Sequence, residues 1–569
     1  MKKARWAIGC LLCLLLLLAA SALADTPKKN TFYISLSAVE DGGEMPADAV
    51  MWQRASNKYY LFLPGGVDLS NARVWFDGAA TVTFGGETLK SGDRTTALKD
   101  GETVRLRFMN KNYNINVMQG STIPALFIST ATGAMTQIDK TKTYREEGSL
   151  RLLDVGGALN YDGALTYIKL RGNTSAKFNK KGYTIKLAQK TDLLGMGKAK
   201  KWVLTSNARD HALIRNQLTF AMADYVGLPY TPECRQVEVY LNHAYNGVYI
   251  LQEKVEIGES RVNITDLERA TELVNDLPLS SYKNLGPKSA TSGHFKYVDI
   301  PNDPEDITGG YLVEFESWQP RYADELSGYT TTRAKVIVVK EPEYASKAQM
   351  EYISSFMQGY ENAIFAADGI DPDTGKRYDE FIDFESLVLK YMLEEISKNC
   401  DGNKSSQYYY KPVDSESTVA FAGPSWDYDT TFGDYGRERD SKALLNPEGF
   451  YHNIINGSRY WWPQLYAKPE FFAGIQTMWT ERYAHAMRIL LGEETDESGK
   501  ILSIQQYAAA IEKSAAMNFI LWPMKQSSEN IANCGKTFKA NIEYLTNYVQ
   551  KRYEFLEKEW GLPAAEADE

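Results

Sequence analysis

The chain has 569 residues and carries 73 Asp and Glu against 63 Lys and Arg, a formal net charge of −10. An acidic chain with only five His is a poor match for general nucleic-acid binding, which needs clustered positive charge for the phosphates. Beyond residue 24 the three cysteines, Cys234, Cys400 and Cys534, are odd in number and widely spaced. They therefore predict neither a disulfide framework nor a zinc site. Two arrangements of the three cysteines stay open: one disulfide with one free thiol, or three buried thiols.

Residues 1–24 have the pattern of a Sec-type signal peptide. Lys2, Lys3 and Arg5 precede an apolar run, and a small-residue cleavage site ends at Ala24. The apolar run is short for a membrane span, so we expect cleavage after Ala24, which would change the net charge to −13. No later stretch reaches the roughly 18 apolar residues that a span needs. We therefore expect a secreted or cell-surface protein without a stable membrane span, of open oligomeric state.

Residues 25–118 are predicted to form an all-β, immunoglobulin-like sandwich. Short runs such as TFYISL, KYYLFLP and TVRLRF are rich in β-branched and aromatic residues. Gly, Asp, Asn and Pro separate these runs at intervals typical of a sandwich. The region shows no catalytic constellation, so we interpret it as an accessory module.

Residues 119–495 are predicted to form an α+β domain that is β-rich first and helical later. A helix is expected over 211–226, because apolar residues recur at helical spacing until Gly227 and Pro229. A hairpin is expected across 243–246, and the polar segment 268–308 is expected to be an inserted loop. Residues 496–569 are predicted to be a helical extension packed on this core. The remaining expected elements are strands at 309–317 and 334–342, and helices near 345–365, 384–398, 505–520 and 537–560.

Two acidic sites 26 residues apart carry the most information about function. A predicted helix runs straight into Asp401, and two β-rich stretches, 407–411 and 418–422, then lead to Asp427. Protein kinases present their catalytic Asp and their magnesium-binding Asp in this order of elements. One carboxylate orients and deprotonates the attacking hydroxyl, and the other holds the metal against the phosphates. The plain alternative is that Asp401 only ends a helix and Asp427 only forms a turn.

Asp427 and Asp429 alternate around Tyr428 in the second acidic site. On an extended segment their side chains would face the same side, as paired metal ligands require. A Ser-His-Asp hydrolase fits poorly, because there is no GxSxG motif and few His are available as a base. A glycosidase stays open, since paired carboxylates and many aromatic residues suit carbohydrate sites.

Lys186, in the strand-like run YTIKL, is a candidate for the fixed cation over the α- and β-phosphates. Glu253 is its best candidate partner, although Lys186 could be an ordinary exposed lysine. Arg171 and Asn173 follow a strand in a turn rich in small residues and hydroxyl groups, which suits close approach to phosphates. There is no GxGxxG loop. Arg215, near the start of the predicted helix, could contact phosphate or brace the acidic loop.

Several of these stretches, taken together, resemble the spore-coat protein H (CotH) kinase family. The similar blocks occur in the same order along the chain and cover about residues 120–480. They are KLRGNTSAKFNKKGYTIKL, GMGKAKKWVLTSNARDHALIRNQL, YNGVYILQEKVE, GGYLVEFE, NCDGNKSSQYYYK and PSWDYDTTFG, followed by WPQLYAKPEFF. The N-terminal β-rich module lies outside the resemblance.

The resemblance implies a divergent protein-kinase-like core that transfers phosphate from ATP to Ser or Thr of exported proteins with Mg²⁺ or Mn²⁺. Carried over by position, Asp401 would be the catalytic Asp and Asp427 the metal-binding Asp, helped by Asp429. Lys186 and Glu253 would clamp the nucleotide.

The chain departs from the kinase pattern at one position. Kinase loops carry a metal-binding Asn about five or six residues after the catalytic Asp. Ser406 and Gln407 stand there instead. Gln407 offers the same carbonyl on a longer stem, and Asn403 is another candidate. A non-catalytic surface or coat scaffold with a degenerate kinase fold is therefore the main alternative, and transfer of AMP is a third.

Overall fold

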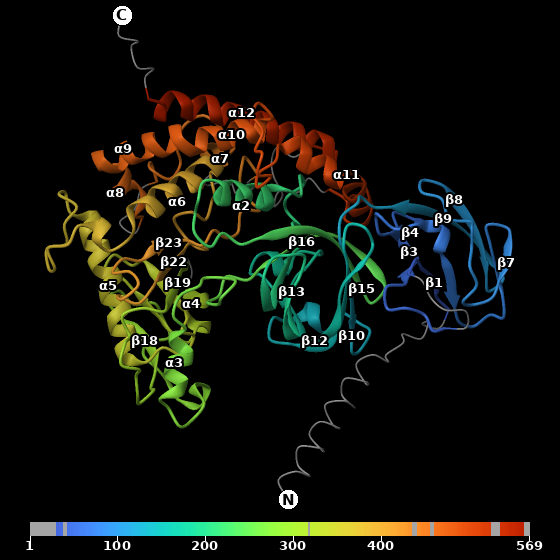
Figure 1. The fold of residues 1–569 in the computed structure, drawn as a ribbon, viewed down its shortest axis with the longest axis horizontal. Helices are drawn as coiled ribbons and strands as arrows, with labels where there is room; N and C mark the ends of the chain where they lie inside the picture. Colours follow the sequence, from blue (N-terminus) through green and yellow to red (C-terminus); the bar gives the residue numbers. More distant parts are fainter. Residues whose placement is uncertain are drawn as a thin grey trace, which may run out of the picture. The chain divides into compact units, whose positions relative to one another are not determined.

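The structure is a computed structural model that describes residues 30–37, 43–316, 319–434, 441–455, 460–524 and 535–562. The chain divides into two compact units, and each is described by itself (Figure 1). Unit 1 comprises the chain up to residue 208 together with 234–252 and 508–524. Unit 2 comprises 209–233, 253–507 and 525–569. The predicted signal peptide lies outside the described residues, and none of the described helices is long and apolar enough to cross a membrane.

The N-terminal region of unit 1 is built from strands, as predicted. They form a three-stranded sheet, β2-β1-β5, and a six-stranded sheet, β3-β4-β9-β8-β6-β7, in which β4 and β9 run parallel. The alternating exposed and buried residues of β8 show that one face of the larger sheet packs on the apolar core. The strands are β1 Phe32–Ser35, β2 Val50–Met51, β3 Gln53–Ala55, β4 Lys58–Leu63, β5 Arg73–Phe76, β6 Val82–Phe84, β7 Glu87–Leu89, β8 Thr103–Phe108 and β9 Lys111–Gln119. The immunoglobulin-like description stays a prediction.

A closed barrel of seven strands follows in unit 1, in the order β10-β11-β12-β13-β14-β16-β15. Alternate residues of each strand fill its interior. On β13, Ile185 and Leu187 belong to this buried core, so Lys186 between them points outward. The strands are β10 Ala125–Thr130, β11 Glu146–Leu153, β12 Leu159–Arg171, β13 Gly182–Asp192, β14 Lys198–Thr205, β15 Cys234–Leu241 and β16 Ala244–Glu253.

Unit 2 combines a seven-stranded sheet, β17-β18-β20-β21-β19-β22-β23, with most of the helices (Figure 1). Helix α6 is central because it contacts α2, α9 and β23. The strands are β17 Asn284–Leu285, β18 Phe295–Val298, β19 Tyr311–Glu316, β20 Gly328–Thr330, β21 Val336–Glu341, β22 Tyr408–Lys411 and β23 Phe421–Ala422. The helices include α2 Arg215–Tyr225, α3 Leu267–Leu273, α4 Gln319–Asp324, α5 Lys347–Phe365, α6 Phe384–Ser397, α7 Ser441–Leu445, α8 Trp462–Tyr466, α9 Pro469–Met478, α10 Ala484–Leu491 and α12 Phe538–Trp560. Helix α11, Ile504–Leu521, enters unit 1 from residue 508 onward.

The mixed α+β class predicted from the sequence is confirmed, and two local expectations are wrong. The segment 268–308 is not a plain loop, because β18 within it pairs with β20 of the main sheet. The helix expected from residue 211 begins at Arg215. Asp210 accepts hydrogen bonds from the amides of Ala212 (2.9 Å) and Arg215 (2.8 Å), which hold 211–214 as a turn. The predicted domain boundaries at residues 118 and 495 stay predictions.

Candidate functional site

Helix α6 delivers Asp401 into a tight loop. The helix starts at Asp383, whose side chain accepts from the amide of Ser386, and it ends where Lys398 adopts a left-handed conformation with φ 47°. The carbonyl of Asp401 accepts hydrogen bonds from the amides of Lys404 (2.7 Å) and Ser405 (3.0 Å). These bonds fold residues 401–405 back on themselves, so the half-buried Asp401 side chain lies just beyond the C-terminus of α6.

The loop that carries Asp427 and Asp429 is not extended, so the premise on which their side chains were expected to face the same side is wrong. Asp427 has φ 67°, in the left-handed region that Asp tolerates better than most residues. The two carboxylates nevertheless interact. Desolvation, followed by the negative charge of Asp427, raises the pKa of Asp429 well above its usual value, and Arg209 acts in the opposite direction. Asp427 itself is exposed, whereas Asp429 is half-buried.

The two acidic loops contact each other directly. The Ser406 hydroxyl donates to Asp427 Oδ2 (3.4 Å), and Cys400 Sγ lies 3.3 Å from Thr430 Oγ1. Burial raises the pKa of the Cys400 thiol, and the charges of Asp401 and Asp429 add to this increase. The structure therefore brings the two acidic loops into contact: Asp401 and Asp429 both act on Cys400, and Asp427 is bonded to Ser406 of the first loop.

Gln407 is completely buried beside this contact. Its side-chain Nε2 makes only a long hydrogen bond to the carbonyl of Ser406 (3.5 Å), and Oε1 has no hydrogen-bond partner among the described residues. A buried amide oxygen without a partner is costly, unless a ligand that is bound during function satisfies it. Carboxylate and amide oxygens are what Mg²⁺ and Mn²⁺ prefer. The chemistry of the donor atoms of Asp427, Asp429 and Gln407 thus fits such an ion.

Asn403 is less suited to metal binding, because its amide nitrogen lies 3.0 Å from Nδ1 of His452. Its main-chain carbonyl accepts from the ammonium of Lys335 (2.9 Å). The described residues contain no group of three His, Cys, Asp or Glu arranged to hold a metal. The predicted set has only two carboxylates and one amide, so phosphate oxygens would have to complete it.

Helix α2 also braces the Asp427 loop. Arg215 Nε donates to the carbonyl of Thr431 (2.9 Å), and its guanidinium contacts Asp210 (2.5 Å) and Asp434 (3.4 Å). Burial raises the pKa of Asp434 to about 7, against the opposing charge of Arg215. Of the two roles open for Arg215 from the sequence, the structure shows the bracing one.

Asn216, the next residue of α2, accepts from the amide of Tyr428 (2.7 Å), between the two predicted metal ligands. The sequence pointed to a polar helix start but did not predict this partner. Ser406 was also missed as a contact of Asp427, because nothing in its local pattern distinguishes it from a turn residue.

The predicted nucleotide-binding residues of unit 1 lie on and near the barrel. The Lys186 ammonium lies 5.9 Å from the ring centroid of Tyr167. Arg171, at the end of β12, donates to Thr205 Oγ1 (3.2 Å). Asn173 accepts from the Lys142 ammonium (2.9 Å) at the surface, so its side chain is engaged by a cation.

Glu253 belongs to unit 2, where its carboxylate contacts the guanidinium of Arg261 and accepts from the amide of Glu233 (3.0 Å). The predicted pair with Lys186 stays a prediction. Cys234 and Cys400 are both buried and no disulfide joins them, and Cys534 lies outside the described residues.

Comparison with known protein families identifies this chain. Residues 168–556 match the family model described as CotH kinase protein, and the chain therefore belongs to this family, as its sequence blocks had indicated. The match includes α2, both acidic loops and most of α12, and it leaves out the N-terminal strands. Membership suggests a kinase-like function that uses ATP and a protein substrate. No curated protein matches the chain.

Proposed function

We propose that this protein is an exported, metal-dependent protein kinase that transfers the γ-phosphate of ATP to Ser or Thr of extracellular or coat proteins. One observation carries the proposal beyond family membership. The Oε1 atom of Gln407 is buried without a partner among the described residues, next to the contact between Ser406 and Asp427. A metal-binding amide is required at this place in a kinase loop, and an oxygen kept free of protein donors is suited to that role.

In this mechanism Asp401 orients the acceptor hydroxyl and accepts its proton as the oxygen attacks the γ-phosphorus. The bond from the γ-phosphorus to the bridging oxygen breaks, and ADP leaves. Asp427, Asp429 and Gln407 would hold Mg²⁺ or Mn²⁺, which would neutralise charge on the phosphates when bound. Arg215 and Asn216 keep the Asp427 loop in place during this step.

The phosphates would be gripped by Lys186, braced by Glu253, with Arg171 and Asn173 nearby in the chain. The outward direction of Lys186 supports this role, because its half-buried side chain points away from the barrel core. The choice of Ser or Thr as acceptor rests on what the family resemblance implies, and we propose a Ser- and Thr-rich exported protein as the substrate.

Intact-mass spectrometry of residues 25–569 tests the proposal. The protein is incubated with Mg-ATP or Mn-ATP and a Ser-rich acceptor, beside the variants Asp427→Ala and Asp401→Asn. We expect one phosphoryl group per modified site in the wild type. Asp427→Ala should lose both metal-dependent nucleotide binding and transfer, whereas Asp401→Asn should bind and fail to transfer. Asp373→Asn, an exposed acid elsewhere in unit 2, is the matched control and should behave as wild type.

Other outcomes would change the assignment. Addition of the mass of AMP would show nucleotidyl transfer by the same residues. No mass change, together with no nucleotide-dependent rise in melting temperature, would refute the kinase and favour a non-catalytic surface scaffold.

A further inference from the structure

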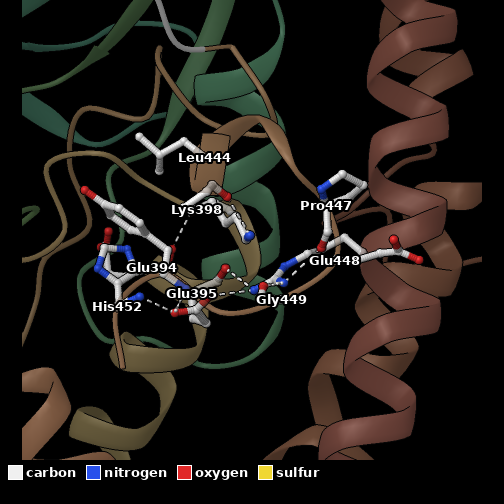
Figure 2. A network of polar contacts seen from close by, with 12 residues as sticks. Glu394, Glu395, Lys398, Leu444, Pro447, Glu448, Gly449 and His452 are labelled. Carbon is white, nitrogen blue, oxygen red and sulfur yellow. Dashed lines mark hydrogen bonds and ion pairs between the residues drawn. The ribbon is translucent and has the colours of Figure 1, made fainter. Parts of the chain in front are cut away.

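Helix α6 carries two consecutive glutamates, Glu394 and Glu395, whose side chains are completely buried (Figure 2). They lie just before residues 399–406, which carry Asp401 and are called the catalytic loop below. Removing a carboxylate from water costs several kcal/mol unless charges and hydrogen bonds compensate it. The groups that contact these two carboxylates therefore show how the cost of burying them is compensated.

One oxygen of Glu394 holds the Asp427 loop. Glu394 Oε1 accepts from the Tyr428 hydroxyl (2.7 Å) and pairs with the Lys390 ammonium (2.9 Å), which also donates to the Tyr428 hydroxyl (2.9 Å). These three buried groups close a triangle. Tyr428 stands between Asp427 and Asp429, so the triangle fixes the loop at its centre. The Tyr428 ring also packs edge-on against Phe220 of α2, with centroids 5.8 Å apart.

The other oxygen of Glu394 faces the catalytic loop. A Cβ atom built on Gly402 would lie 2.8 Å from Glu394 Oε2 and 2.9 Å from His452 Nε2. Both atoms are buried, and neither has a hydrogen-bond partner among the described residues. They converge on the α-carbon of Gly402, directly after Asp401, where a side chain would collide with them. The Trp462 indole donates to the Gly402 carbonyl (2.6 Å) and holds the same residue.

His452 extends this contact along the catalytic loop. Its Nδ1 lies 3.0 Å from the amide nitrogen of Asn403, so Nδ1 is assigned as the acceptor and the ring proton to Nε2. Burial, followed by the charge of Lys404, lowers the pKa of His452 to about 3, while the nearby main-chain carbonyl of Glu394 acts in the opposite direction. The ring is therefore neutral, with one proton directed at the Gly402 side.

Glu395 fixes the main chain that carries His452. Its Oε2 accepts from the amide of His452 (2.6 Å), and its Oε1 accepts from the amide of Tyr451 (2.9 Å) (Figure 2). Glu395 thus holds the backbone of His452, while the neighbouring Glu394 faces its ring.

We propose that Glu394 is a positioning residue that couples the two acidic loops. Its Oε1 restrains Tyr428 of the metal-binding loop, and its Oε2 faces Gly402 and His452 of the catalytic loop. A displacement of either loop moves the shared carboxylate and thereby disturbs the other. One rigid helix thus holds Asp401 in place relative to Asp427 and Asp429, in addition to the direct contacts between the two loops. The catalytic consequence of this coupling rests on the kinase function proposed above.

Hydrogen–deuterium exchange tests the coupling without requiring activity. Tyr428→Phe removes one hydroxyl and keeps the packed ring. We expect it to increase exchange about threefold or more in peptides covering 399–406 as well as in its own loop. His452→Gln should likewise increase exchange, in this case in peptides covering 427–433 of the other loop. Tyr311→Phe, which loses a hydroxyl bonded to the carbonyl of Ile307 (2.8 Å), is the matched control and should change neither loop.

Unchanged exchange at 399–406 in Tyr428→Phe would overturn the proposal, even if His452→Gln failed to fold. A second readout is the metal concentration that gives half of the ATP-induced rise in melting temperature. Each single variant should raise this metal concentration. In the double variant the increase should be smaller than the product of the two single increases. Independent effects would contradict the coupling. A wild type that shows no response to ATP would refute the kinase function, while the exchange data would still decide the coupling.

Discussion

The buried ion pair between Arg552 of α12 and Glu395 of α6 should dominate the stability of unit 2. Both side chains are fully buried, and the guanidinium lies 2.7 Å from Glu395 Oε1. Arg552 also donates to the carbonyls of Glu395 (2.7 Å), Gly449 (2.6 Å) and Pro447 (3.0 Å), the last two near the C-terminus of α7 (Figure 2). Arg552→Met would leave a buried carboxylate with two amide donors and would remove the donor from three carbonyls.

Breaking one partner of such a buried pair costs about 3–5 kcal/mol, because the remaining charge is uncompensated. We expect Arg552→Met to lower the free energy of unfolding of unit 2 by about that amount. Unfolding in denaturant measures this loss, and calorimetry provides a second measurement. Arg377→Met is the matched control. Arg377 forms a similar pair with Asp379 (2.7 Å) but is 42% exposed, and exposed pairs contribute about 0–1 kcal/mol.

The double variant Glu395→Leu with Arg552→Met separates charge burial from packing. Because it removes both buried charges, it should be more stable than Arg552→Met alone. The reasoning would be refuted if Arg552→Met stayed within about 1 kcal/mol of wild type, or if the double variant lost the sum of both single effects.

Three further predictions concern single residues. Gln407→Met should leave the unfolding free energy nearly unchanged, because the lost amide oxygen has no hydrogen-bond partner in the described part of the chain. It should weaken metal-dependent ATP binding measured by calorimetry, and equal affinity would contradict the metal role. Asp401→Asn should keep that affinity and abolish transfer, and residual transfer at the wild-type rate would exclude Asp401 as the base. Glu238, buried in β15 and accepting from Ser514 (2.7 Å), has its pKa raised by burial to about 8, compared with 4.5 as its ordinary value. The folded state therefore binds its proton more tightly than the unfolded state, so unit 1 should lose stability as the pH rises from 4.5 to about 8. Glu238→Gln should remove this loss in thermal unfolding from pH 5 to 8.5, and parallel curves for variant and wild type would contradict it.

The sequence by itself determined the order and type of most elements. Apolar periodicity predicted α5, α6, α11 and α12, and short β-rich runs predicted β13 and the hairpin of β15 and β16, because these signals depend on neighbours within a few residues. The same local signals located Asp401 at the end of a helix and Asp427 beyond two strands.

Burial and pairing across long chain distances were decided only by the tertiary structure. Glu394 and Lys390 lie four residues apart within an apolar run, which was the one signal that these charges are buried together. Nothing local indicated that Tyr428 would complete their triangle, or that Arg552 would pair with Glu395. The extended geometry expected around Asp427 failed for the same reason. Asn216 and Ser406, which contact this loop, belong to segments whose approach depends on how the whole unit packs.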